Sequence, residues 1–436
     1  MDAGSPAGVA GGEPGMEPEK SVVTTSTKPV RVLYCESNTD GTVGGSHYCL
    51  LYLIRHLDRT RFRPTVLFYD HHAIVPQFEA EAETFVHEKD TPVQWGTGST
   101  GLLSLPLTAA RRAVNLAKNR LKIRRHVAFL EQHGIQLVHL NNSITRHHDW
   151  MTAAAMRGIP CVVHERGLPR YGRADIAMGR RLAAIIPMSK WIARAMVEQG
   201  VDPANIRVMY DGLDPAGFVP RRSPEELRRE FDVRPDQPVV GIVGNIRHWK
   251  GQETVARALV EVVKAHPDVV CFFVGATTPG DVPYKDGIER IIADAGIGAN
   301  VRFTGYQSDV ASFVNTMRFL IHASVEPEPF GMVVLEGMAA HKAVIGSRAG
   351  GPVEMVLEGE TGYTFPLGDA ATLAARMTEL LSDPARAERM GQRGYERLVS
   401  DFSVQRYMHD IHGTYDAVLA GRPLPAGVPL TADGQP

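Results

Sequence analysis

Two segments of this sequence share the order of a buried strand, a glycine-containing loop and a helix, and this repeated order constrains the fold most. The first begins at Val30 (VRVLYC), in an apolar and β-branched run, and reaches a helix at about Ser46. The second begins at Pro238 (PVVGIV) and reaches a helix at about Gln252. Each is typical of the opening of a doubly wound α/β domain. A chain of 436 residues has room for two such domains, each with its own core.

The first glycine loop contains Gly44 and Gly45, which allow the backbone to approach a ligand closely. The loop has neither the G-x-G-x-x-G pattern of dinucleotide sites nor the G-K-[ST] of a P-loop. A tight turn without a ligand explains the two glycines equally well. These residues alone leave both interpretations open.

The segment 324–356 (SVEPEPFGMVVLEGMAAHKAVIGSRAGGPVEMV) contains a loop that leads directly into a helix starting at Met332. Glu328 lies in the loop, and Glu336 lies about one turn into the helix. The free N–H groups of a helix N-terminus favour a phosphate, whereas carboxylates bind hydroxyl-rich groups. A phosphate with sugars on either side describes a nucleotide sugar. For an isolated pair of glutamates, a solvated helix start would be the better explanation.

Three runs in this region extend the pattern, namely S-V-E-P-E-P-F-G-M-V-V-L-E-G-M-A, A-G-G-P-V-E-M-V and G-E-T-G-Y. Together they resemble the donor-binding signature of the retaining glycosyltransferases of family 4. The resemblance covers roughly residues 30–420. It implies the GT-B fold, in which two Rossmann-like doubly wound domains face each other and a C-terminal crossover helix returns to the first domain.

The expected organisation follows from this resemblance together with the composition. The ends of the chain are rich in Gly and Pro, and residues 214–236 are polar and rich in Pro. The predicted parts are a disordered tail (1–28), an acceptor-side N-terminal domain (29–213), a hinge (214–236), a nucleotide-sugar-binding C-terminal domain (237–400), a crossover helix (401–421) and a loose tail (422–436).

The resemblance implies transfer of a sugar from a UDP-, GDP- or ADP-sugar to a glycan or lipid-linked acceptor, with retention of the anomeric configuration. The catalytic residues that the resemblance implies are His164, Glu328 and Lys250. Arg247 does not match the family's arginine, but it lies two residues further along and is expected to reach the same phosphate. The implied donor-binding residues are Gly44, Gly45, Asn245, Tyr306, Phe330, Gly331, Met332, Val333 and Glu336. No cofactor is expected. The chain has no D-x-D, so we expect a diphosphate held by protein cations and no metal site.

Within this scheme, Glu336 would contact the ribose, Glu328 the donor sugar and His164 a sugar hydroxyl. Lys250 and Arg247 would hold the diphosphate. Two positions depart from the family pattern. Asn245 stands where most members have arginine, and Asp211 stands where asparagine is usual. Asn245 is the best support for a rival hypothesis, a regulatory protein that binds a nucleotide sugar without transferring it.

Two further enzyme classes share this fold and remain alternatives. A sugar-nucleotide epimerase would use the same cleft without an acceptor, and a phosphorylase would need a lysine-bound pyridoxal phosphate. A metal site at 147–149 (HHD) lacks a third ligand at suitable spacing, so a solvated loop is the favoured interpretation.

Residues 107–128 predict a basic amphipathic helix, because 91–130 contain no Asp or Glu and the apolar residues recur at helical spacing. The commoner explanation is a core helix with a solvated basic face. The alternative is peripheral contact with anionic lipid on the inner face of the membrane.

Composition excludes several classes of function. The net charge of −2 indicates no general attraction to nucleic acid. The four cysteines are scattered without C-x-x-C, which is typical of reduced thiols in a cytoplasmic protein. No apolar run approaches the roughly 18–20 residues of a membrane-spanning helix, and residues 1–28 lack the pattern of a signal peptide.

Overall fold

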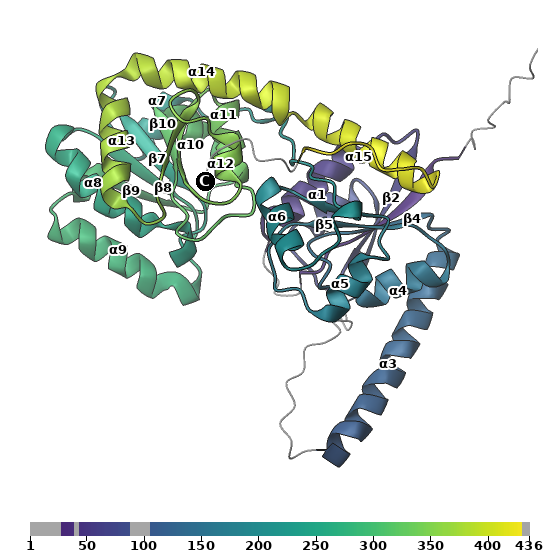
Figure 1. Ribbon diagram of the computed structural model, residues 1–436. Coiled ribbons are helices and arrows are strands. Elements are labelled where there is room, and N and C mark those ends of the chain that lie inside the picture. The colour runs from purple at the N-terminus through teal and green to yellow at the C-terminus, as the bar shows by residue number, and fades with distance from the viewer. Residues whose placement is uncertain (1–27, 39–42, 88–104, 430–436) are drawn as a thin grey trace, which may run out of the picture.

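The computed structural model describes residues 28–38, 43–87 and 105–429, with the backbone alone for 105–114. Two six-stranded sheets, each with its own layer of helices, dominate the molecule (Figure 1). Apart from Lys28, the predicted N-terminal tail lies outside the described residues, as do residues 430–436 of the predicted C-terminal tail.

The N-terminal sheet is parallel throughout and has the order β3-β2-β1-β4-β5-β6. Its strands are β1 (Val30–Cys35), β2 (Phe62–Phe68), β3 (Glu83–Val86), β4 (Leu137–Leu140), β5 (Cys161–Glu165) and β6 (Ala184–Pro187). The helices of this half are α1 (Gly45–Arg55), α2 (Val75–Glu79), α3 (Leu105–Gln132), α4 (His148–Met156), α5 (Arg173–Gly179) and α6 (Lys190–Glu198).

The C-terminal sheet repeats this plan, with the order β12-β11-β10-β7-β8-β9 and parallel pairing throughout. Its strands are β7 (Val239–Val243), β8 (Val270–Val274), β9 (Val301–Gly305), β10 (Phe319–His322), β11 (Ala343–Ser347) and β12 (Gly362–Phe365). Its helices are α7 (Pro224–Glu230), α8 (Gln252–Ala265), α9 (Val282–Asp294), α10 (Val310–Thr316), α11 (Met332–Ala339), α12 (Pro352–Met355), α13 (Ala370–Ser382) and α14 (Pro384–Asp401).

The predicted fold class is therefore confirmed: two doubly wound sheets, with the strands that open each domain at the centre. β1 and β7 are central because their residues are apolar on both faces, which suits a parallel strand covered by helices on each side. β3 and β12, each at one edge of its sheet, are not among the strands expected from the sequence. β3 (ETFV) is only partly buried, so it lacks the continuous apolar run that identifies a central strand, whereas β12 (GYTF) is buried but short and begins with glycine.

The predicted crossover helix is also present, as α15 (Val404–Leu419). Ser403 caps its N-terminus by accepting a hydrogen bond from the N–H of Arg406, so a new helix begins just after α14. In Figure 1, α14 lies along the C-terminal domain and α15 along the N-terminal domain. Tyr407, Met408 and Ile411 of α15 pack into the same apolar core as β1 and β2.

The chain passes between the two domains twice, near Leu213 and near Ser403, and these two segments lie side by side. The N–H of Leu213 donates to the carbonyl of Phe402 at 2.9 Å, and Leu213 pairs with Ser403 as an isolated parallel bridge. A Cβ on Gly212 would lie 2.7 Å from the carbonyl oxygen of Ser403, so this close approach requires glycine.

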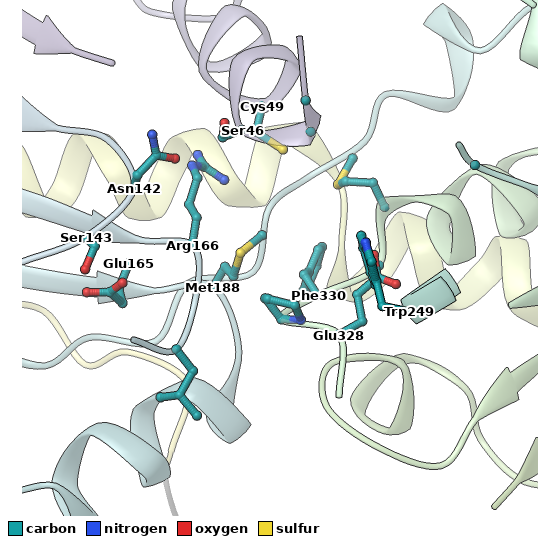
Figure 2. Close-up of a pocket in the computed structure, with 18 of the residues that line it drawn as sticks. Ser46, Cys49, Asn142, Ser143, Glu165, Arg166, Met188, Trp249, Glu328 and Phe330 are labelled. Atoms are coloured by element: carbon teal, nitrogen blue, oxygen red, sulfur yellow. The ribbon is translucent and has the colours of Figure 1, made fainter. Parts of the chain in front are cut away.

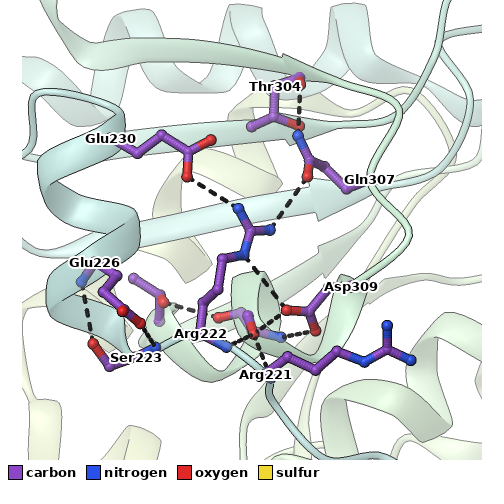
Figure 3. Close-up of polar contacts among 10 residues, drawn as sticks. Arg221, Arg222, Ser223, Glu226, Glu230, Thr304, Gln307 and Asp309 are labelled. Atoms are coloured by element: carbon purple, nitrogen blue, oxygen red, sulfur yellow. Dashed lines mark hydrogen bonds and ion pairs between the residues drawn. The ribbon is translucent and has the colours of Figure 1, made fainter.

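Most of the segment 214–236, predicted as a hinge, is fastened to the C-terminal domain (Figure 3). Ser312 Oγ accepts the N–H groups of both Arg221 and Arg222 at 2.9 Å. The Arg222 guanidinium lies 3.0 Å from Glu230 and 3.5 Å from Asp309. α7 also lies within this segment. The part of the predicted hinge that has no such attachment to the C-terminal domain is therefore about 214–220.

Candidate active site

A cavity of about 1010 Å³ opens between the two domains. Its walls come from the loops that follow β1, β4 and β5 on one side and β7 and β10 on the other. All these loops leave the carboxyl ends of parallel strands, where open α/β sheets place their ligand sites. Figure 2 shows Arg166 and Asn142 on the N-terminal side, facing Trp249, Glu328 and Phe330 on the C-terminal side.

Glu328 is the most heavily bonded acidic group of the C-terminal wall. Its Oε1 lies 2.7 Å from the ammonium of Lys250. Its Oε2 lies 2.7 Å from both His322 Nε2 and Ser324 Oγ. Burial alone would raise the pKa of the Glu328 carboxyl, but Lys250 and His322 outweigh burial and hold that pKa well below its usual range. The side chain is therefore a fixed, ionised carboxylate at the wall of the cavity.

The loop after β7 supplies the cations of this wall. Lys250 lies over the ring of Trp249, with its nitrogen 4.1 Å from the ring centroid. Arg247 lines the cavity as well, and its Nε is 3.4 Å from Asp281 Oδ2. Asn245 also lines the cavity, at the position where the family has arginine. The structure thus brings Lys250 and Arg247 to one side of the cavity, as the sequence predicts.

The helix that follows Glu328 points its N-terminus at the same space. α11 begins at Met332 after Gly331, whose φ of 97° is left-handed and favours glycine. The helix has no side-chain N-cap and no acidic residue in its first turn. Phe330, Met332, Val333 and Glu336 all line the cavity with it. Burial raises the pKa of the Glu336 carboxyl to about 7, and Lys250 only partly opposes this.

Gly350 and Gly351 stand just before the short helix α12, where a pair of glycines suggests a second phosphate-binding loop. In the structure they serve close packing. Neither residue lines the cavity. A Cβ on Gly350 would lie 2.1 Å from the carbonyl oxygen of Glu328, and one on Gly351 would lie 2.4 Å from the backbone of Phe330. The two glycines therefore let this turn pack against the loop that carries Glu328.

On the N-terminal wall, Gly44 and Gly45 line the cavity at the start of α1. Arg166, after β5, lines it too. The Arg166 guanidinium lies 2.6 Å from Asp211 Oδ2 and donates to Asn141 Oδ1 at 2.7 Å. Asp211, the second departure from the family pattern, is thus the buried partner of an arginine at the cavity wall.

His164, which was predicted to contact a sugar hydroxyl, does not line the cavity. Its side chain is wholly buried behind the wall, with Nε2 3.8 Å from Asp211. Burial holds the pKa of His164 well below its usual value, and the charge of Arg166 lowers it further, so the imidazole is neutral. The residue that reaches the cavity is Arg166, two positions later.

Tyr306 is a second predicted contact that the structure places elsewhere. The residue is 69% exposed and does not line the cavity. Val310, which follows the end of β9 by five residues, lines the cavity instead.

The interpretation of 147–149 as a solvated loop is wrong. His147, His148 and Asp149 are all fully buried. Asp149 accepts from His126 Nε2 at 3.0 Å, and Lys122 lies 3.3 Å away, which ties α3 to α4. Among the residues with described side chains, no group of three or more His, Cys, Asp or Glu could hold a metal ion.

Three residues in or directly behind the cavity wall were not identified from the sequence. His322 ends a parallel strand, the same signal that drew attention to His164, and it contacts Glu328 directly. Arg166 follows a strand end by one residue. Glu165 lines the cavity, is buried and accepts the N–H of Ile144 at 3.0 Å, and burial raises its pKa to about 8. No local pattern in the sequence distinguishes Glu165 from an ordinary strand residue.

The four cysteines are free and buried. Across residues 28–38, 43–87 and 105–429, no helix is both long and apolar enough to cross a membrane.

Comparison with known families gives two matches that together span most of the chain. Residues 44–212 match the glycosyl transferase 4-like domain, and residues 223–397 match the glycosyl transferases group 1.

Similar curated proteins include two of lipopolysaccharide core biosynthesis. The mannosyltransferase LpcC of Rhizobium leguminosarum bv. viciae is 27% identical over 49% of this chain and 60% of its own length. The glycosyltransferase LpsE of Rhizobium meliloti (strain 1021) is 31% identical over 45% of this chain and 54% of its own. The chain thus matches only 54–60% of the length of these relatives.

Among solved structures, Anabaena HepE in complex with UDP superimposes with a TM-score of 0.73 at 21% identity. The match covers 89% of this chain and 100% of HepE. HepE has also been solved with UDP-glucose, with a TM-score of 0.70. At this identity, the likeness establishes the fold.

Proposed function

Because the chain belongs to the group 1 glycosyl transferases with a family 4-like N-terminal domain, we propose that it transfers a sugar from a nucleoside diphosphate sugar to an acceptor hydroxyl, with retention. The observation that carries the proposal is the composition of the C-terminal wall of the cavity. The Glu328–Lys250 pair, Arg247 and the uncapped N-terminus of α11 converge on it from two loops.

The donor fits this wall by its charges. The diphosphate would lie against Lys250, Arg247 and the N–H groups around Gly331, Met332 and Val333, and Glu336 would bind the ribose hydroxyls. Glu328, held ionised by Lys250 and His322, would accept a hydrogen bond from a hydroxyl of the donor sugar. These polar groups are fixed before a ligand arrives.

The main change of charge in the proposed reaction occurs when the diphosphate departs. As the glycosidic bond to the leaving oxygen breaks, negative charge grows on that oxygen. Fixed cations and a helix N-terminus directed there stabilise the transition state more than the ground state. The incoming acceptor hydroxyl loses its proton to the departing diphosphate, so no covalent enzyme intermediate and no metal are required.

A thermal-shift screen of UDP-, GDP- and ADP-sugars tests the donor. A bound ligand at a hundred times its Kd stabilises the folded state by about 2.7 kcal/mol. UDP-glucose is the first to try, because HepE binds it. Product analysis by NMR would then show transfer with retention. A purified sample that no nucleotide sugar stabilises, or a Glu328→Ala variant with unchanged turnover, would contradict the proposal.

The same assays separate the rival functions. An epimerase changes the sugar when the donor is supplied alone, whereas a transferase leaves it unchanged apart from slow hydrolysis. A phosphorylase would show the visible absorption of pyridoxal phosphate. Calorimetric donor binding without turnover on any acceptor would favour the regulatory protein that Asn245 suggests.

We further propose that the acceptor is a glycan or a lipid-linked glycan and that α3 contacts anionic lipid. In Figure 1, α3 extends away from the N-terminal sheet. Its exposed side chains include Leu116, Leu121 and four cations, which are Lys118, Arg120, Arg124 and Arg125. Side chains of 107–114, also part of the predicted membrane face, lie outside the described set. Each cation near an anionic surface adds about 1 kcal/mol.

Liposome flotation tests this contact. Recovery with vesicles containing phosphatidylglycerol should fall with added salt and with the variant Arg120→Glu/Arg124→Glu. An equal recovery with neutral vesicles, or none with anionic ones, would end the membrane proposal without affecting the donor site.

A further inference from the structure

The N-terminal half of the cavity carries three arginines outside the donor wall. Arg146 comes from the loop after β4, and Arg166 and Arg170 come from the loop after β5. Both loops leave neighbouring strands of the sheet, so the three side chains line one region of the cavity.

The arginines differ in their partners. Arg166 is paired with Asp211 at 2.6 Å and is nearly inaccessible. Among the described residues, the Arg146 side chain makes one long hydrogen bond, of 3.5 Å, between its Nη1 and the carbonyl of Ser37. Arg170 is exposed, and within the described residues neither Arg146 nor Arg170 has a carboxylate within ion-pair distance. Arg166 therefore belongs to the scaffold, and the other two guanidinium groups remain available.

The acidic groups of this half do not neutralise them. Burial raises the pKa of Glu165 to about 8, so this carboxyl is mostly uncharged at neutral pH. Asp175 is engaged elsewhere, accepting the N–H of Gly172 at 2.7 Å with His148 Nε2 3.0 Å from its other oxygen. The start of α1, which also lines this half, has neither a side-chain cap nor an acidic residue in its first turn.

Two guanidinium groups that pair with no carboxylate among the described residues, set in a concave wall, attract and orient an anion. Arginine binds phosphate and carboxylate oxygens in a bidentate manner, and low-dielectric walls strengthen the attraction. A neutral sugar would leave this charge unbalanced. We propose that this half of the cavity binds an acceptor bearing a phosphate or a carboxylate, with Arg146 and Arg170 as the recognising groups. The inference rests on the proposed transferase function, since it names the class of its acceptor.

The test compares matched sugars that differ in one anionic group. Calorimetry at low salt, with the full chain in the presence of UDP, would use glucose, glucose 6-phosphate, glucuronate and inorganic phosphate. We expect at least one anionic sugar to bind ten-fold or more tightly than glucose, with an affinity that falls as salt is added. A preference for glucose 6-phosphate assigns a phosphate, and one for glucuronate a carboxylate.

The variant Arg146→Gln/Arg170→Gln should lose this preference, while UDP binds with unchanged affinity. Arg180→Gln is the matched control, because Arg180 is an exposed arginine of the same domain that does not line the cavity. The two single variants, each with an intermediate loss, keep the test decisive if the double variant folds poorly.

The inference would be overturned by equal binding of neutral and anionic sugars, by no binding of any anionic probe, or by a preference that survives in the double variant. A loss of UDP affinity in the double variant would assign the arginines to the donor and would also overturn it. Failure of the wild-type protein to bind UDP would instead count against the proposed function, and the anion comparison on the same sample would still decide this inference.

Discussion

Glu354 accepts a hydrogen bond from the hydroxyl of Tyr210 at 2.8 Å, and this contact joins the two domains. The same carboxylate accepts the first two N–H groups of α6, from Lys190 at 2.9 Å and Trp191 at 2.8 Å. Glu354 belongs to α12 in the C-terminal domain, whereas α6 belongs to the N-terminal one. A carboxylate at the positive end of a helix dipole is a favourable arrangement, so Glu354 fixes how the walls of the cavity face each other.

Replacing Glu354 by Gln should loosen the arrangement of the domains. The substitution removes the negative charge of the acceptor and places the NH2 group of the amide against an N–H group of α6. The contact between Glu354 and α6 should therefore weaken by about 1.5–3 kcal/mol. Small-angle scattering without ligand should show a larger radius of gyration, and KM for the donor should rise. Glu360→Gln, at an exposed position, is the control. An unchanged scattering profile and KM would show that other contacts set the domain arrangement.

Lys250→Ala should reduce kcat by a factor of about 10² to 10³, because a fixed cation at the leaving group is removed. Glu328 keeps its contacts with His322 and Ser324, so the fold should persist, as circular dichroism can verify. Lys264→Ala, which removes an exposed lysine paired with Glu261, should leave turnover unchanged. Wild-type turnover in Lys250→Ala would remove Lys250 from the proposed site.

Glu336→Gln should stabilise the ligand-free protein increasingly as pH rises. The folded-state pKa of Glu336 is raised from 4.5 to about 7 by burial. Between these values, the folded protein holds a proton that the unfolded chain releases, so this group lowers stability as pH increases, and its full penalty is present above pH 7. At about 1.4 kcal/mol per pKa unit, this shift corresponds to a penalty of at most about 3.5 kcal/mol.

The measurement is the difference in Tm between Glu336→Gln and wild type, which should be small at pH 4.5 and largest at pH 8. Glu225→Gln, at an exposed position, should show no such trend. A constant difference across this range would mean that Glu336 titrates normally. Weaker donor binding by the same variant would link the destabilising carboxyl to its proposed role on the ribose.

Ile411→Ala should destabilise the N-terminal domain by about 2–5 kcal/mol, the usual range for a buried large-to-small change. Ile411 is fully buried in the core that α15 shares with β1 and β2. Gln405→Ala, on the exposed side of the same helix, should change stability by less than about 0.5 kcal/mol. Chemical denaturation followed by fluorescence would measure both. Equal effects would mean that α15 packs loosely against the first domain.

The fold could be read from the sequence because apolar runs such as VRVLYC and PVVGIV identify central parallel strands without reference to the rest of the chain. The C-terminal wall of the cavity could be located for a similar reason, since Glu328, Phe330, Gly331 and Glu336 lie within one continuous loop and helix. The hydrogen bonds of Glu328 to His322 and Ser324 needed the structure, although both partners are within six residues of it.

The N-terminal wall was predicted less well. Whether His164 or Arg166 reaches the cavity depends on how the chain leaves β5, and the N–H of Arg166 extends the pairing by donating to the carbonyl of Asn142 at 2.9 Å. That contact joins residues 24 positions apart, and no local pattern reports it. Asp211, Asn141 and Arg166 likewise meet only after the sheet has formed.

The return of α15 to the first domain has a consequence for synthesis of the protein. The core around β1 and β2 contains Tyr407, Met408, Ile411 and Tyr415, which follow the whole C-terminal domain in the order of the chain. The N-terminal domain is translated before the C-terminal domain, but its core therefore cannot be completed until α15 has been synthesised. The first domain therefore cannot reach its final packing before the second domain has been translated, and a chain stopped after α14 would leave the residues that pack against α15 uncovered.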